Sequence, residues 1–154
     1  MIFKNESTLL SVLHEIMAEM FFIFPDMDDN GVPTQFIESF NAYYCTSIDY
    51  GNGDFLFFEW DRNMLNSMAA NFLGAEQGEV TDAQIQSMAL EATNVIGGRY
   101  LVLVDPDKKR SLSLPHFLRG KEIDTYKSKS PIMHVGFVSD EKRCALRVSA
   151  YHKR

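Results

Sequence analysis

Apolar side chains recur at spacings of three and four along two long stretches of the chain, and this period predicts helices. The first stretch covers residues 7–24, and Pro25 ends it. The second begins at Thr81, where Gln84 completes a capping box, and it continues until Pro106 stops it. We therefore expect one helix near the N-terminus and a longer one in the middle of the chain.

Short runs of apolar, aromatic and β-branched residues predict strands over residues 42–50, 54–60, 111–114, 132–138 and 143–151. Residues 51–53 link the first two as a tight hairpin, and residues 140–141 link the last two. A shorter helix, capped by Asp61 and closed by Gly74, follows the first hairpin. Since hairpins make neighbouring strands antiparallel, we expect an α+β fold: an antiparallel sheet with helices packed on one face.

The long helix has two contrasting faces. Its predicted core face carries residues spaced by four, three, four, four and three: Ile85, Ala89, Ala92, Ile96, Tyr100 and Leu103. Nearly opposite that face lie Ser87, Glu91, Asn94 and Gly98. Glu91 and Asn94 are therefore expected one turn apart, pointing away from the core. Their small neighbours Ser87 and Gly98 leave room for another surface to approach closely.

The composition of the 154 residues is that of an ordinary globular protein, with 45% hydrophobic and 23% charged residues. One domain over residues 1–154 is expected, because a domain takes about 100–200 residues. A net charge of −6 argues against nucleic-acid binding. The densest apolar run, residues 20–24, is far shorter than the about 20 residues of a membrane span. With no recognisable signal peptide, we expect a cytoplasmic protein without a membrane contact, whose Cys45 and Cys144 are reduced.

An acidic turn over residues 26–31, with Asp26, Asp28 and Asn30, is similar to the start of a calcium-binding EF-hand loop. That loop requires a bidentate Glu at its twelfth position, where this chain has Ile37, with Glu38 one residue late. A solvated turn after a helix is therefore the favoured interpretation. The histidines and cysteines show no metal-ligand spacing, and the chain has no recognisable nucleophile motif or phosphate loop.

The spacing Glu91-x-x-Asn94 is by itself a weak motif. Glu38-x-x-Asn41 has the same spacing, but it lies at the entry to a predicted strand, where residues three apart face opposite sides. The setting of Glu91 gives it weight: a capped helix, an uninterrupted core face opposite, small flanking residues, and a Leu-Pro stretch soon after.

Around this motif the sequence reads Leu90-Glu91-Ala92-Thr93-Asn94-Val95-Ile96-Gly97-Gly98-Arg99-Tyr100-Leu101, followed later by Leu112-Ser113-Leu114-Pro115. This resembles the signature of the CheC/CheX/FliY chemotaxis phosphatases, in which a helix bearing Glu-x-x-Asn leads into a Leu-Ser-x-Pro strand. The order of elements over residues 7–151 is also similar, although only residues 87–115 are specific. Thr93 departs from the family, which often has an apolar residue there, and so does the acidic turn.

CheC-like members carry the motif twice, once on the first helix and once on the helix related to it by pseudo-symmetry. Here Glu15 is followed by Ala18 where Asn is needed, so the chain resembles CheX, the single-motif and homodimeric type. The resemblance therefore implies a homodimer. Leu90 and Leu101 fall beside the Asn94 side of the helix, where either a dimer contact or burial under another element of the chain accounts for them.

The reaction that the resemblance implies is hydrolysis of the aspartyl phosphate on a phosphorylated CheY-like response regulator. Asn94 would orient the attacking water, and Glu91 would pair with a lysine of the regulator. Ser87, Leu90 and Gly98 would lie against that partner. The regulator's own carboxylates would hold Mg²⁺, so no cofactor is expected on this chain.

Two other interpretations stay open at this point. A CheX-like adaptor would bind receiver domains or other signalling partners without hydrolysis, and the lifetime of the regulator's phosphate would then be unchanged. A plain structural module would use Glu91 and Asn94 only as a solvated helix face.

Overall fold

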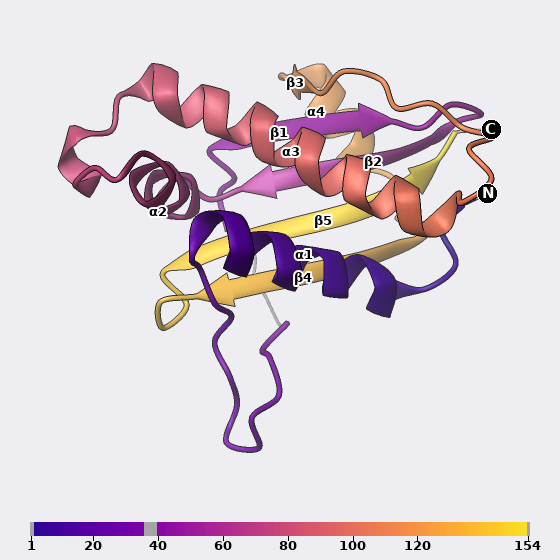
Figure 1. The fold of residues 1–154 in the computed structure, drawn as a ribbon. Coiled ribbons are helices and arrows are strands. Elements are labelled where there is room, and N and C mark those ends of the chain that lie inside the picture. The colour runs from indigo at the N-terminus through magenta and orange to yellow at the C-terminus, as the bar shows by residue number, and fades with distance from the viewer. Residues whose placement is uncertain (1, 36–39, 154) are drawn as a thin grey trace.

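The computed structural model describes residues 2–35 and 40–153 and places its longest helices in one layer over a twisted sheet (Figure 1). The α-helices are α1 (Glu6–Phe21), α2 (Arg62–Leu73), α3 (Asp82–Val104) and α4 (Lys121–Lys127), with a 3₁₀ turn η1 (Gln77–Glu79) before α3. The strands are β1 (Tyr44–Asp49), β2 (Asp54–Trp60), β3 (His116–Leu118), β4 (Met133–Ser139) and β5 (Cys144–His152).

The five strands form one sheet in the order β3-β1-β2-β5-β4. Every neighbouring pair is antiparallel, including the central pair of β2 and β5. Glycines at positive φ (Gly51 and Gly53) form the turn between β1 and β2, as the sequence predicts. The expected α+β fold with an antiparallel sheet is therefore confirmed.

Helix and hairpin occur twice in this order, which gives the fold an internal near-symmetry. α1 precedes the hairpin β1–β2, and α3 precedes the hairpin β4–β5. The two hairpins join through β2 and β5 at the centre of the sheet. α1 packs on β4 and α3 packs on β1, so each long helix covers the outer strand of the other hairpin (Figure 1).

Alternation along the strands separates two apolar layers. In β2, Leu56, Phe58 and Trp60 are fully buried and belong to the main core under α1, α2 and α3. Phe55 and Phe57 face the other way and join a smaller apolar cluster on the opposite sheet face. Because successive side chains of a strand point to opposite faces, one strand contributes to both layers.

α4 lies on that opposite face and was not predicted. Its Tyr126 packs against Phe57 and Tyr151, with ring centroids 5.5 and 5.9 Å apart. The three longer helices lie on one face as expected, so the one-face arrangement holds for them and not for α4. A seven-residue helix with a single buried side chain carries too little periodicity to be recognised in the sequence.

One predicted boundary and one predicted strand were wrong. α1 ends at Phe21, because Phe22 adopts a left-handed conformation (φ 54°) and caps the helix. Residues 111–114 form no strand; instead Ser113 donates its backbone N–H to the Asp49 carbonyl at 2.9 Å and accepts the Asp49 N–H on its hydroxyl. These two hydrogen bonds join Ser113 to the last residue of β1 without forming a strand.

Candidate functional site

The capping box at Thr81 fixes the start of α3 and therefore which residues point outward. The Thr81 hydroxyl accepts from the Gln84 backbone, and the Gln84 side chain accepts from the Thr81 N–H. From this start, Glu91 and Asn94 lie on the outer face of α3, and both are exposed. The structure thus places the two predicted site residues side by side, one helical turn apart.

The remaining positions of α3 largely follow the predicted pattern. Ser87 is exposed and Gly98 half-buried on the outer face. Five of the six predicted core residues are buried, but Leu103 is 54% exposed. That expectation was wrong because Leu101 and Val104 form the core side of the last turn of α3, and Leu103 is turned away from it. Leu90 and Leu101 are both half-buried, and Leu101 packs against the main core, so burial within the chain accounts for Leu101.

Thr93 fixes the core side of α3 directly behind Asn94. Its hydroxyl donates to the Ala89 carbonyl at 2.7 Å and lies 2.6 Å from the Thr46 hydroxyl. Because Thr93 uses its proton on Ala89, the Thr46 hydroxyl donates to Thr93. Thr46 in turn accepts from the Trp60 indole N–H at 2.8 Å. The Thr46, Trp60 and Thr93 side chains are fully buried. Directional bonds of this kind fix the rotation of α3 about its axis, because a buried group without its partner costs about 1–3 kcal/mol.

Gly97 sets how closely α3 approaches the sheet. A Cβ at this position would lie 2.9 Å from Ile48 Cγ2 and 3.3 Å from the Tyr50 hydroxyl. Glycine inside a helix costs about 1 kcal/mol relative to alanine, so a close contact of this kind explains its use here. The depth of α3 on β1, and with it the height of Asn94 above the sheet, depends on the missing side chain.

The Tyr50 hydroxyl adds a polar contact at the same place. The hydroxyl donates to the Gly97 carbonyl at 2.9 Å, and the Tyr50 side chain is fully buried. Burial raises the pKa of Tyr50 well above its usual value, and the neighbouring Tyr100 raises it further. The phenol therefore stays protonated and keeps its role as donor.

The sequence does not predict these supports, although signals for them exist. Thr93 stands out only as a departure from the family pattern, and Gly97 only as one glycine of the segment that resembles the family. A polar β-branched residue next to a core stripe, and a glycine in the middle of a capped helix, both indicate a special packing contact. Their partners are Thr46 on β1 and Tyr50 directly after it, and both lie in the segment that the hairpin pattern predicts as a strand.

The corresponding place on α1 is occupied differently. Glu15 forms an ion pair with Arg99 of α3, and both side chains are partly exposed. Three residues after Glu15 stands Ala18, which has no amide group. At the position equivalent to Glu91 and Asn94, α1 therefore has a paired carboxylate and no carboxamide, in agreement with the single-motif pattern.

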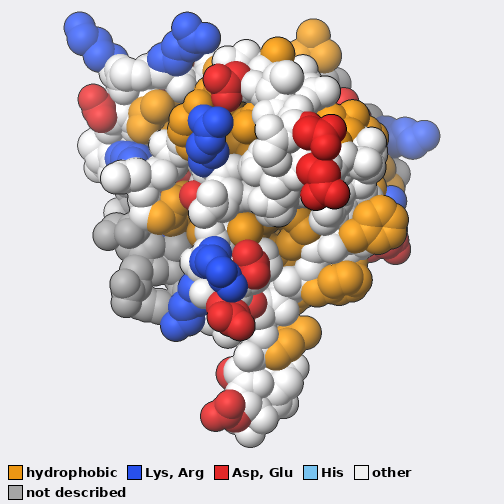
Figure 2. All heavy atoms as spheres, turned by 90° about the vertical axis from the view of Figure 1, so that its left-hand side faces the viewer, with side chains coloured by type: hydrophobic (Ala, Val, Ile, Leu, Met, Phe, Trp, Pro, Cys, Tyr) orange, Lys and Arg blue, Asp and Glu red, His pale blue; other side chains and the backbone are white. Residues whose placement is uncertain are grey.

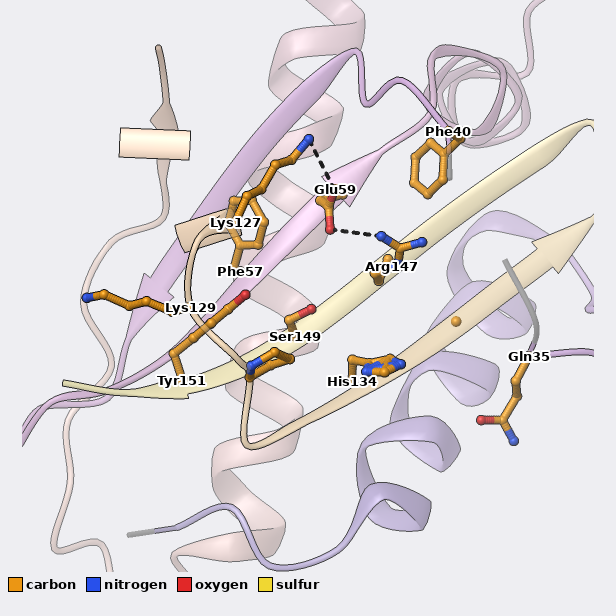
Figure 3. A pocket seen from close by; sticks show the side chains of 12 residues that line it. Gln35, Phe40, Phe57, Glu59, Lys127, Lys129, His134, Arg147, Ser149 and Tyr151 are labelled. Atoms are coloured by element: carbon orange, nitrogen blue, oxygen red, sulfur yellow. Dashed lines mark ion pairs between the residues drawn. The ribbon is translucent and has the colours of Figure 1, made fainter. Parts of the chain in front are cut away.

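One hollow adjoins Glu91, and another lies on the opposite face of the sheet among charged side chains. A groove of about 450 Å³ is lined by residues of α2 and α3: Phe72, Leu73, Ala83, Gln84, Ser87, Met88 and Glu91. A hollow of about 500 Å³ lies on the opposite face of the sheet, where Glu59 stands 3.8 Å from Lys127 and 3.5 Å from Arg147 (Figure 3). Of the described residues that line this second hollow, none is a predicted site residue.

The acidic turn folds as a hydrogen-bonded loop. Asp28 Oδ1 accepts from the backbone N–H groups of Asn30 and Val32, and the Asp26 carboxylate accepts from those of Glu141 and Lys142. These contacts satisfy the carboxylates within the protein. Ile37 and Glu38, at the end of the EF-hand pattern, lie outside the described residues. Glu38 is also the first residue of the second Glu-x-x-Asn spacing, so the structure does not describe that spacing in full.

Three further features concern residues 2–35 and 40–153: metal-ligating groups, thiols and helices that could span a membrane. Within these ranges, no group of three or more His, Cys, Asp or Glu side chains is arranged to hold a metal ion. Cys45 and Cys144 are buried free thiols. None of the described helices is long and apolar enough to cross a membrane.

Solved structures with a similar fold are chemotaxis proteins. CheX from Vibrio vulnificus aligns with a TM-score of 0.67 at 14% identity, over 98% of this chain and 99% of that chain. The CheX–CheY–BeF3–Mg²⁺ complex from Borrelia burgdorferi gives 0.67 at 12% identity, over 98% and 99%. A CheC-like superfamily protein from Shewanella sp. PV-4 gives 0.59 at 11% identity, over 96% and 99%. At these identities the likeness shows the fold.

Comparison by sequence gives the family. No curated protein matches the chain. The family model described as chemotaxis phosphatase CheX matches residues 50–138, which is more than half of the 154 residues. The matched segment contains all of α3, with Glu91 and Asn94 on its outer face. The chain belongs to the CheX family of chemotaxis phosphatases.

Proposed function

We propose that this protein hydrolyses the aspartyl phosphate of a CheY-like response regulator, and that Glu91 and Asn94 carry the activity. The observation that supports this most is the exposed Glu91–Asn94 pair on a helix whose opposite side is hydrogen-bonded, through Thr93 and Gly97, to β1 and to the residue directly after it. An exposed polar pair needs no such support, whereas a group that must reach a phosphorylated side chain at a set depth does.

The carboxamide of Asn94 suits the reaction. Phosphoryl transfer passes through a loose transition state and depends on an attacking water held in line with the scissile bond. An amide offers both a donor and an acceptor to that water, and it carries no charge to repel the phosphoryl oxygens. Misplacing such a group by about 1 Å costs on the order of 100-fold in rate.

Glu91 takes a different role in the proposal. As an exposed carboxylate one turn before Asn94, it pairs with a lysine of the regulator and sets how far Asn94 enters the partner's active site. Mg²⁺ is held by the carboxylates of the regulator, so the chain contributes no metal ligand. Ser87, Leu90 and Gly98 form the rim against which the partner rests.

We also propose a homodimer and a cytoplasmic location, both because the chain resembles CheX. Sedimentation at micromolar concentration tests the first: a species of twice the chain mass supports it, and a monomer contradicts it. The second follows from the partner, since a receiver domain of a chemotaxis pathway is cytoplasmic.

The direct test follows the acyl phosphate on purified receiver domains from the same cell, with and without this protein. The proposal predicts a shortened phosphate lifetime for at least one receiver at substoichiometric amounts of protein. If a receiver binds tightly while its phosphate lifetime is unchanged, the protein is an adaptor. Unchanged lifetimes for every receiver contradict the phosphatase assignment.

A further inference from the structure

Exposed apolar side chains gather beside the Glu91 end of the helix layer. Phe72 and Leu73, in the last turn of α2, are 51% and 48% exposed. Figure 2 shows hydrophobic side chains along the side of this face where the helix layer lies. Together with Met88, Ser87 and Glu91 of α3 they line the groove of about 450 Å³ described above. We call it the α2–α3 groove.

The α2 side of the groove is held in place by contacts with α1. The Phe72 ring packs against the buried Phe21 ring at 6.1 Å between centroids. The side chain of Asn71 donates to the Phe21 carbonyl at 2.8 Å, and Gly74 ends α2 in a left-handed conformation (φ 66°). The exposed apolar surface is therefore a preformed feature rather than a loosely attached end.

The groove is continuous with the proposed phosphatase site. Ser87 and Glu91 belong to both, and Asn94 follows Glu91 by one turn on the same helix face. A partner that seats its phosphorylated side chain on Asn94 must therefore cover at least the Glu91 end of the groove. Among the described residues lining the groove, Glu91 is the sole charged one, so an apolar group with a cation beside it fits best.

We propose that the α2–α3 groove receives an exposed apolar side chain of the response regulator's receiver domain, next to the lysine that pairs with Glu91. This inference rests on the proposed function, because it identifies the partner through the reaction at Asn94. Burial of Phe72 and Leu73 against that side chain supplies affinity, while Asn94 supplies the rate.

The test separates affinity from rate. Leu73→Gln keeps α2 intact, because its side chain is half exposed and ends the helix outside the core, and it should raise KM about tenfold with kcat unchanged. Phe72→Gln should act in the same direction. Val102→Gln is the matched control, since Val102 is 68% exposed on the far end of α3, and it should leave both constants unchanged. Circular dichroism confirms that each variant is folded.

A parallel measurement of Kd, with a receiver domain activated by beryllofluoride, distinguishes the two proposals. If the wild type hydrolyses the phosphate and Leu73→Gln changes neither KM nor Kd, the groove proposal is overturned and the phosphatase stands. If the wild type binds without hydrolysis, the phosphatase proposal is overturned, and the Kd of Leu73→Gln decides the groove alone. A wild type that binds no receiver overturns both.

Discussion

α1 and α3 are related by the near-symmetry of the fold, yet only α3 carries a candidate site. Each precedes an antiparallel hairpin, and each packs on the outer strand of the other's hairpin. On α3, Glu91 is exposed and Asn94 follows three residues later. On α1, Glu15 is paired with Arg99 and Ala18 replaces the amide. The equivalent positions of the two helices therefore carry different functional groups: a carboxylate and a carboxamide on α3, and an ion-paired carboxylate and a methyl group on α1.

The core sides of the two helices differ as well. Two and six residues after Glu91, α3 has Thr93 and Gly97, which contact β1 and the adjoining Tyr50 through hydrogen bonds and a close approach. At the same offsets from Glu15, α1 has Met17 and Phe21, both fully buried. Bulky apolar side chains bury area but tolerate small shifts, whereas directional bonds and a missing Cβ fix position. At these two positions the side chains of α1 contribute apolar packing, whereas α3, the helix with the candidate site, has directional contacts and a close approach to the sheet.

Asn94→Ala should have the largest effect on activity. We expect a loss on the order of 100-fold in the acceleration of dephosphorylation, because the water is no longer positioned. The fold should be unaffected, since the side chain is exposed and alanine is the better helix former. Decay of the receiver's acyl phosphate measures the rate, and thermal unfolding checks the fold. Asn41→Ala, exposed just before β1, is the matched control and should be fully active.

Gly97→Ala tests whether close approach positions α3. The added Cβ meets Ile48 at 2.9 Å, so overpacking of about 1–3 kcal/mol exceeds the about 1 kcal/mol gained in helix propensity. We expect a net loss of stability and reduced turnover. Gly98→Ala is the control for stability, because its Cβ would meet only Leu112, at an ordinary 3.6 Å. Denaturant unfolding compares the two, and equal stability would show that Gly97 does not set the depth of the helix.

Glu91→Ala should weaken binding as well as turnover. Loss of one intermolecular ion pair at an exposed position predicts a rise of about tenfold in Kd for the activated receiver. Titration of the receiver at increasing salt checks the cause: the difference between wild type and variant should shrink as screening increases. A difference that does not depend on salt would exclude an ion pair.

Ala18→Asn should have the smallest effect. Placed in the inactive Asn94→Ala background, it restores the Glu-x-x-Asn spacing on α1, but Glu15 remains paired with Arg99. We therefore expect no recovery of phosphatase activity in the acyl-phosphate assay. Recovery would show that spacing alone is sufficient and that the fixed core side of α3 is unnecessary.

The sequence predicted the parts of this molecule that depend on local, periodic signals. The capping box at Thr81 and the helical period of α3 are enough to place Glu91 and Asn94 outward. The supports of the site depend on contacts between distant segments, such as Tyr50 with Gly97, and one sequence does not reveal them. For the same reason the sequence predicts a strand over residues 111–114, although Ser113 instead makes hydrogen bonds with the distant Asp49.

The position of Asn94 relative to the phosphoryl group tests the central claim most directly. A crystal structure of this protein with a receiver domain carrying beryllofluoride on its aspartate measures it. We predict that the Asn94 carboxamide lies within about 3–4 Å of the beryllofluoride, either directly or through one water, and that Glu91 pairs with a receiver lysine. A complex in which the receiver binds elsewhere and leaves the outer face of α3 in solvent would contradict the account.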